Sequence, residues 1–140
     1  LRHGYEAVAQ AGLEDRVVLV KSYLPEGEAP AEQYDLVFSN SLLHHLPKAE
    51  TLWQAVKRWA APTAPVFVMD LLRPSDAAQA RKLAQAQVGY ESEVLQQDFH
   101  NSLLAAYSID EVEGQLAQAE LSHLNVRQVS DRHLTASGRI

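Results

Sequence analysis

The 140-residue sequence contains no cysteine, which excludes disulfide bonds and thiolate metal sites and fits a reducing, cytoplasmic location. No apolar run approaches the roughly 20 residues that a helix needs to cross a bilayer, so we expect no membrane partner. The sequence also lacks a basic excess, because its formal net charge is -6. A surface that binds nucleic-acid phosphates requires such an excess, and we therefore expect no nucleic-acid partner.

Apolar residues make up 46% of the chain and charged residues 21%, values close to those of an average soluble globular protein. No internal repeat or shift in composition divides the sequence, so residues 1–140 are predicted to form a single domain. The sequence begins with Leu1 rather than Met, directly in a helical pattern. We take this start as an indication that an N-terminal part is missing.

Hydrophobic periodicity predicts strands and helices that alternate along the chain. Strands are predicted at 16–20, 34–38 and 66–72, and a final pair at 124–129 and 133–136. Helices are predicted at 3–11, 47–61, 74–87, 93–107 and 109–119, the last behind a capping box of Ser108 and Glu111. This order predicts an α/β fold with a mainly parallel sheet and a C-terminal antiparallel strand pair.

Three small polar residues, Ser39, Asn40 and Ser41, follow the buried strand at 34–38. In open α/β sheets, ligands bind beyond the carboxyl ends of the strands, where small side chains let a ligand approach the backbone. The same residue types also cap turns by bonding to their own backbone. These three residues are therefore candidate ligand contacts, with turn capping as the alternative.

Two adjacent histidines, His44 and His45, follow these residues. Neighbouring side chains point in different directions, whereas a chelating pair on a helix prefers positions three or four apart, so we predict no metal site. We assign His45 to the cavity, where it would act as a base for a hydroxyl or amine acceptor, and we expect His44 to pack under the helix.

Other polar residues could have either a structural or a functional role. Asp70 ends the strand at 66–72, and a cavity group, an ion pair with Arg73 and a helix start are all open to it. Ser130, Asp131 and His133 are expected to fix the turn between the final strands. A hydrolase triad is not supported, because the G-x-S-x-G elbow is missing.

Four segments together resemble the second half of the class I S-adenosylmethionine-dependent methyltransferases. Residues 34–47, YDLVFSNSLLHHLP, resemble that family's fourth strand and the turn after it, and residues 53–62, WQAVKRWAAP, resemble the next helix. Residues 66–74, VFVMDLLRP, resemble the fifth strand, and residues 108–121 resemble the helix before the antiparallel pair. The resemblance extends from about Tyr5 to the end of the chain.

The resemblance implies transfer of a methyl group from S-adenosylmethionine to a small-molecule acceptor by in-line displacement. It assigns the turn at 39–41 to the cofactor, together with Ser22 and Tyr23, which lie after the family's third strand. The family often carries an aspartate in that region to face the adenine amino group, and here Lys21 or Ser22 stands in its place. Residues 74–107 become a helical insertion that caps the acceptor.

The sequence departs from the family at its cofactor site. The six glycines, at positions 4, 12, 27, 89, 114 and 138, include no G-x-G-x-G turn, and the strand with the acidic ribose ligand is absent. In the family's strand order those missing strands would leave a gap of roughly 14 Å beside residues 16–20. The backbone groups of residues 16–20 would then be unpaired.

We therefore expect an N-terminally truncated form of an enzyme. The alternative is a catalytically silent fragment, or a subunit that completes its sheet with an upstream segment, a partner or a second copy of itself.

Overall fold

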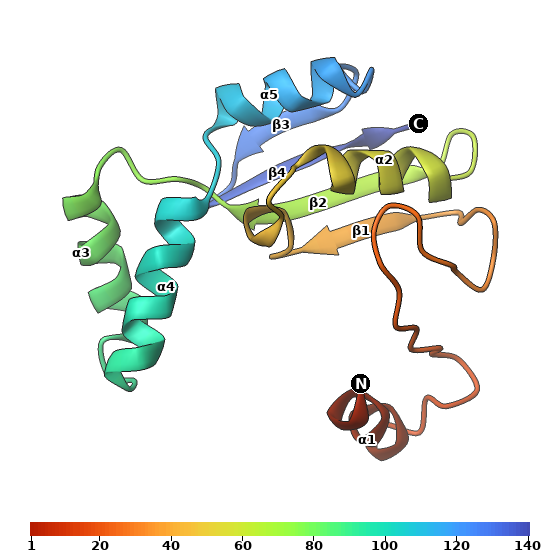
Figure 1. Cartoon of the computed structure of the whole chain (residues 1–140), viewed down its shortest axis with the longest axis horizontal. Helices are drawn as coiled ribbons and strands as arrows, with labels where there is room; N and C mark the ends of the chain where they lie inside the picture. The colour runs from red at the N-terminus through yellow and green to blue at the C-terminus, as the bar shows by residue number, and fades with distance from the viewer.

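A computed structural model describes residues 1–140, which form one mixed four-stranded sheet with the order β1-β2-β4-β3 and five α-helices (Figure 1). The elements are α1 (Arg2–Gln10), β1 (Val37–Asn40), a 3-10 turn η1 (Leu43–His45), α2 (Glu50–Trp59), β2 (Pro65–Leu71), α3 (Ala77–Val88), α4 (Glu93–Ala105), α5 (Ile109–Gln118), β3 (Asn125–Gln128) and β4 (His133–Arg139).

The strands pair in two ways. β1 runs parallel to β2, in a register that places Val37 beside Val66 and Asn40 beside Met69. β4 is antiparallel to β2 on one side and to β3 on the other. The predicted α/β class and the C-terminal antiparallel pair are confirmed, while the parallel part of the sheet consists of one strand pair.

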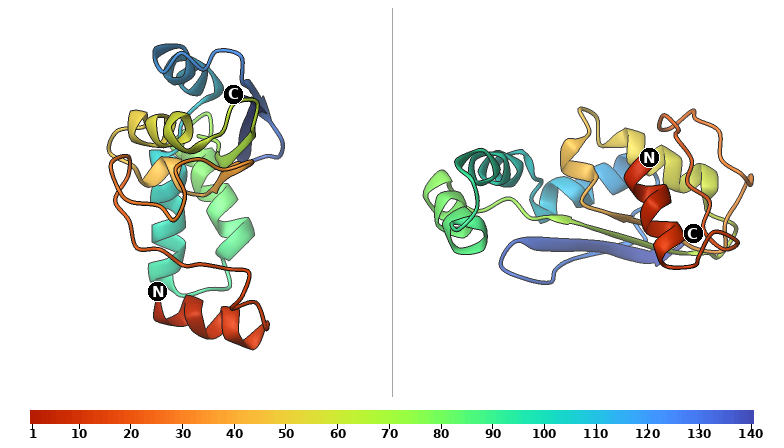
Figure 2. Two further views of the ribbon diagram at one scale, coloured as in Figure 1. Left: turned by 90° about the vertical axis from the view of Figure 1, so that its right-hand side faces the viewer. Right: turned by 90° about the horizontal axis from the view of Figure 1, so that it is seen from below.

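Helices α2 and α5 lie on one face of the sheet (Figures 1 and 2). The side chains of β2 alternate accordingly, with Val66 and Val68 buried on the covered face. Trp53 of α2 is completely buried, and its Nε1 donates a hydrogen bond to Oε1 of Gln115 at 3.1 Å. The opposite face carries the neighbouring pair Phe38 and Phe67, whose exposed fractions are 71% and 41%.

Helices α3 and α4 form a hairpin beyond the end of the sheet (Figure 1). Each begins with a side-chain cap, because Asp76 accepts a hydrogen bond from Gln79 N and Ser92 accepts one from Leu95 N. The hairpin has a small core of its own, formed by Leu71, Ala80, Ala84, Leu103 and Ala106. The helices predicted at 74–87 and 93–107 are confirmed within three residues at each end.

The capping box predicted before α5 is present. Oγ of Ser108 accepts from Glu111 N at 3.2 Å, and Oε2 of Glu111 accepts from Ser108 N at 2.7 Å. The helix then buries Val112 and Leu116 against the sheet. No helix in the structure combines the length and the apolar character that a membrane crossing requires.

The strand predicted at residues 16–20 is wrong. The segment has no regular secondary structure, and Val18 is 73% exposed. A β-branched run favours strand structure only where neighbouring strands supply hydrogen bonds and packing, and no strand lies beside this one. Its one side-chain bond runs from the hydroxyl of Tyr5 to the carbonyl of Leu19, at 3.1 Å.

The predicted strand at 34–38 begins later than expected, at Val37, and extends to Asn40. Tyr34 forms an isolated parallel bridge with Ala60, the residue that follows α2. The helix predicted from residue 47 begins at Glu50, behind the 3-10 turn.

Candidate functional site

The carboxyl ends of β1 and β2 lie side by side because the two strands are parallel. Ser41 follows β1 with a φ of 53°, in the left-handed region, and its N–H donates to the carbonyl of Met69 at 2.9 Å. The hydrogen bond ends the pairing of β1 with β2, and the left-handed backbone of Ser41 turns the chain there. The turn that carries the two histidines is thereby placed over the end of β2.

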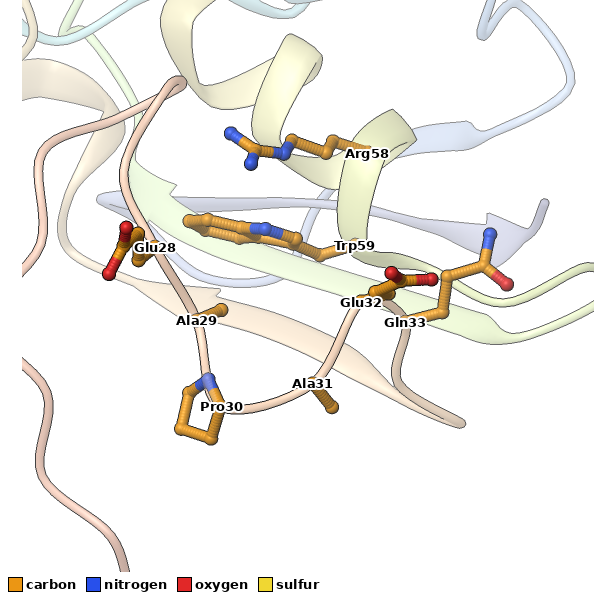
Figure 3. A pocket seen from close by; sticks show the side chains of 8 residues that line it. All are labelled: Glu28, Ala29, Pro30, Ala31, Glu32, Gln33, Arg58 and Trp59. Atoms are coloured by element: carbon orange, nitrogen blue, oxygen red, sulfur yellow. The ribbon is translucent and has the colours of Figure 1, made fainter.

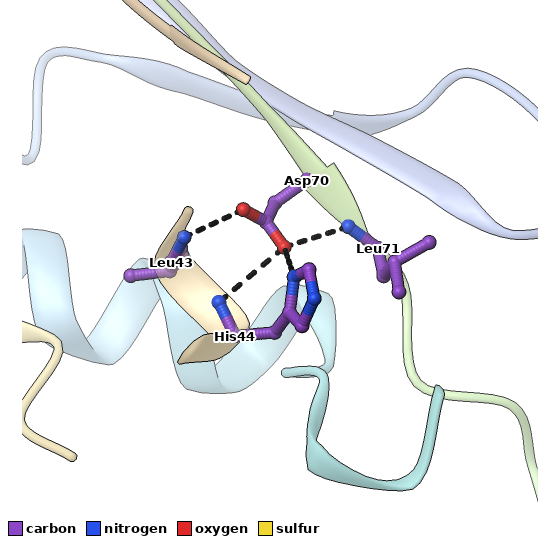
Figure 4. Close-up of polar contacts among 4 residues, drawn as sticks. All are labelled: Leu43, His44, Asp70 and Leu71. Atoms are coloured by element: carbon purple, nitrogen blue, oxygen red, sulfur yellow. Dashed lines mark hydrogen bonds and ion pairs between the residues drawn. The ribbon is translucent and has the colours of Figure 1, made fainter. Parts of the chain in front are cut away.

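Asp70 fixes this turn from the neighbouring strand. Its side chain is 2% exposed, and Oδ2 accepts a hydrogen bond from Leu43 N at 2.7 Å (Figure 4). Oδ1 accepts from Leu71 N at 2.8 Å and, at a longer distance of 3.4 Å, from His44 N. A buried carboxylate needs such donors to offset the loss of water, so Asp70 and the turn depend on each other.

The same carboxylate is paired with a histidine side chain. Nδ1 of His44 lies 2.5 Å from Oδ1 of Asp70, and the His44 side chain is 4% exposed. Burial by itself raises the pKa of Asp70, but the hydrogen bond and charge of His44, with the N–H groups of Leu71 and Leu43, outweigh it and lower the pKa overall. Because the carboxylate accepts from Nδ1–H, Nε2 is the His44 nitrogen that remains available to accept a proton.

His45 lies beside this pair and is exposed. The two imidazole centroids are 3.9 Å apart, with the rings inclined at 41°. Both histidines line a shallow hollow of about 370 Å³ whose other residues, Asp98, Asn101, Ser102 and Ala105, belong to α4. Our assignment of His45 as the base stays a prediction. The histidine that contacts the buried carboxylate of Asp70 is His44.

The ion pair considered between Asp70 and Arg73 is not formed. Arg73 Nη1 instead binds Oε1 of Glu111 at 2.9 Å, and its Nε donates to the carbonyl of Ala106 at 2.7 Å. The backbone explains the difference, because residue 70 faces the covered side of the sheet, where the turn after β1 lies. Sequence reasoning missed the pair of His44 and Asp70; the adjacent carboxyl ends of two parallel strands were the available signal.

The three polar residues after the buried strand differ in exposure. Asn40 and Ser41 are exposed at the end of β1, whereas Oγ of Ser39 is buried and has no hydrogen-bond partner. Buried hydroxyl groups are normally paired, so Ser39 is an exception among the side chains of the sheet. No group of three or more His, Asp or Glu side chains is placed to hold a metal ion.

The other two predicted cofactor residues lie in the loop before β1. Oγ of Ser22 donates to the carbonyl of Glu28 at 2.9 Å, and Tyr23 is 80% exposed. Ser22 borders a hollow at the C-terminal end of α2, next to Trp59, and a neighbouring hollow there is shown in Figure 3. The structure does not bring these residues into one hollow with Ser39, Asn40 and Ser41.

Ser130, Asp131 and His133 fix the turn between β3 and β4, as expected. Oγ of Ser130 lies 2.9 Å from Nδ1 of His133 and accepts from Arg132 N at 3.2 Å, while Asp131 pairs with the Arg132 side chain at 2.8 Å. Burial and the positive charge of Arg132 lower the pKa of His133. This arrangement stabilises the turn.

No family model and no curated protein sequence matches the chain. Its structure is similar to that of a SAM-dependent methyltransferase from Aquifex aeolicus, with a TM-score of 0.66 and 19% identity over 99% of this chain and 62% of that one. It is also similar to a presumed O-methyltransferase from Nostoc punctiforme PCC 73102, with a TM-score of 0.62 and 20% identity over 95% of this chain and 40% of that one.

At these identities the likeness concerns the fold: the chain has a class I SAM methyltransferase-like fold. It spans 62% and 40% of the lengths of the two structures it matches.

Proposed function

We propose that the chain takes part in the transfer of a methyl group from S-adenosylmethionine to a small-molecule acceptor. The observation that carries the proposal is the polar turn at the carboxyl end of β1, in a methyltransferase-like fold, with Asp70 holding the next residues in place. Ligands of open α/β sheets bind at this edge.

S-adenosylmethionine, when bound, supplies a methyl group on a sulfonium, which is already a strong electrophile. The task of the protein is then to orient the acceptor. Ser39, with its unpaired buried hydroxyl, and the exposed Asn40 and Ser41 would hold the cofactor. These residues fit part of the group, since the chain has no G-x-G-x-G turn and no acidic ribose ligand at the end of a second strand.

The acceptor would lie on the side of the two histidines. His44 has the arrangement of a general base, with Nδ1 held by a buried carboxylate and Nε2 able to accept the proton that a hydroxyl or amine acceptor loses. His45, our assignment from the sequence, faces the same hollow. Helix α4 of the hairpin supplies the other wall, which supports the role of the hairpin as a cap over the acceptor.

The acceptor class follows from charge and size. The net charge of -6 disfavours a polyanion such as nucleic acid, and the hollow between the histidines and α4 suits a small molecule. The absence of cysteine supports a cytoplasmic enzyme.

A second candidate function is a catalytically silent chain that becomes competent when an upstream segment or a partner completes the sheet. The observation in its favour is the free edge of β1 together with the backbone of residues 18–20, which makes no hydrogen bond to other backbone groups. On this view the present chain would supply the acceptor side, and the added segment would supply the missing parts of the cofactor site.

Calorimetric titration with S-adenosylhomocysteine, the demethylated product, separates the two candidates. Micromolar binding by the chain alone supports a competent cofactor site, and the absence of heat supports the silent chain. Methyl transfer to a panel of hydroxyl and amine acceptors then compares His44→Gln with His45→Gln. A general base at His44 predicts loss of about 10²–10⁴-fold in kcat for His44→Gln and a much smaller loss for His45→Gln.

A further inference from the structure

The two edges of the sheet differ in character. β3, at one edge, is a short polar strand in which Asn125, Arg127 and Gln128 are exposed. β1, at the other edge, presents Phe38 at 71% exposure and is preceded by Leu36 at 51%. An edge strand offers a row of unpaired N–H and C=O groups, and charged or polar residues are the usual protection against pairing. β1 carries no charged residue, and its exposed side chains include Phe38.

The same chain carries a strand-forming segment that has no partner. Residues 17–20 are Val, Val, Leu and Val, and the three valines are 37%, 73% and 45% exposed in chain order. The backbone of residues 18–20 makes no hydrogen bond to other backbone groups. An exposed apolar run with free backbone groups has the composition of a strand that pairs with an exposed edge.

Charges at the ends of the two segments are complementary. Arg16 and Lys21 flank the apolar run, while Glu32 and Asp35 precede β1, and all four side chains are exposed. In a chain with a net charge of -6, most surfaces of two copies repel each other. Antiparallel pairing that sets Val18 beside Phe38 also sets Lys21 beside Asp35, so opposite charges meet at that end and favour one register.

We propose that the chain forms a symmetric dimer in which residues 16–20 of each copy pair with the free edge of β1 in the other copy. A two-fold axis forms the same strand pair twice, because each copy contributes one segment and one β1 edge. Such an interface is isologous. The added strand also places valine side chains next to Phe38, on the face of the sheet that no helix covers. The proposal rests on these two segments and does not depend on methyl transfer.

The absence of cysteine allows a direct test by disulfide cross-linking. Val18→Cys and Phe38→Cys are made as separate variants, one with a tag that changes its mass, and are mixed under mild oxidation. The proposal predicts a mixed cross-linked dimer. The matched control replaces Phe38→Cys with Val94→Cys on α4, because Val94 has the same exposed fraction of 71% and lies away from both segments. That mixture is expected to give at least about tenfold less cross-linked product.

Sedimentation equilibrium of the unmodified chain supplies the second measurement. A dimer is expected, with a dissociation constant that Val18→Asp raises at least about tenfold and Val94→Asp leaves unchanged. Asp35→Lys should weaken the dimer, and Lys21→Glu in the same chain should restore part of the loss. A monomer at all concentrations overturns the proposal, and so does a dimer that cross-links equally through Val94. An intramolecular disulfide in a monomeric Val18→Cys, Phe38→Cys double variant also overturns it, since the segment would then pair within its own chain.

Discussion

Nδ1 of His44 and Oδ1 of Asp70 are 2.5 Å apart, although the two residues are 26 positions apart in the sequence. This contact joins the turn after β1 to the end of β2. Both side chains are almost fully buried. The carboxylate also accepts from the N–H of Leu43 in the turn and from the N–H of Leu71 at the end of β2, so one side chain holds the turn against β2. The histidine next to the proposed acceptor hollow is oriented by the same group.

Asp70→Asn is predicted to lower the free energy of unfolding by about 2–4 kcal/mol, because it removes the negative charge from a buried, multiply bonded site. Urea denaturation followed by circular dichroism measures the change. Asp131→Asn makes the same chemical change at an exposed turn position and should alter the free energy by no more than about 0.5 kcal/mol. Equal effects of the two substitutions would show that the buried pair of His44 and Asp70 contributes no more to the free energy of unfolding than an exposed carboxylate does.

The stabilisation from Asp70 should disappear in acid. The pKa of this carboxyl is lowered in the folded chain from an ordinary value of 3.8, so the stabilisation is fully present above that value and is lost as pH falls through the folded pKa. The difference in unfolding free energy between the native chain and Asp70→Asn is therefore expected to shrink as pH drops below about 3.8. A difference that stays constant from neutral pH to strong acid would contradict this assignment.

Ser39→Ala is predicted to leave the free energy of unfolding unchanged or to raise it by up to about 1 kcal/mol, because the hydroxyl is buried without a partner. Thr135→Val removes the other unpaired buried hydroxyl of the sheet, on β4, and should behave alike. The two should differ in ligand binding, since only Ser39 lies at the proposed cofactor edge. Calorimetry with S-adenosylhomocysteine distinguishes them, and equal affinities of both variants would remove Ser39 from the site.

Gly114→Ala is predicted to raise the free energy of unfolding by about 0.5–1 kcal/mol. Gly114 lies inside α5 with open space where a Cβ would be, so the substitution restricts the unfolded chain without a clash. Gly138→Ala on β4 is the contrast, because its Cβ would lie 2.8 Å from Cδ2 of Leu124 and 3.4 Å from its Cα. Thermal denaturation should therefore show a higher Tm for the first variant and a lower Tm for the second.

The sequence predicted those parts of the fold in which local signals and tertiary packing agree. The capping box at Ser108 and Glu111, the buried strand at residues 66–72 and the antiparallel pair at the end of the chain all appear where they were expected. Each carries its own periodicity or capping signal, and each has a neighbour that pairs with it.

The predictions that failed depended on a distant neighbour. Residues 16–20 have strong strand propensity but no strand beside them, and propensity alone does not form a sheet. Asp70 was considered with Arg73, three positions away in sequence, whereas its partner His44 becomes adjacent only through the parallel pairing of β1 and β2. Long-range pairing of this kind leaves no local pattern in the sequence.

The central claim, that the turn after β1 binds the methyl donor, is tested most directly by NMR. The backbone amides of the ¹⁵N-labelled chain are recorded during titration with S-adenosylhomocysteine. We expect saturable shifts centred on Ser39, Asn40 and Ser41, which Ser39→Ala weakens and Thr135→Val does not. Amides of this turn that stay unchanged at saturating ligand, or shifts confined to another part of the chain, would contradict it.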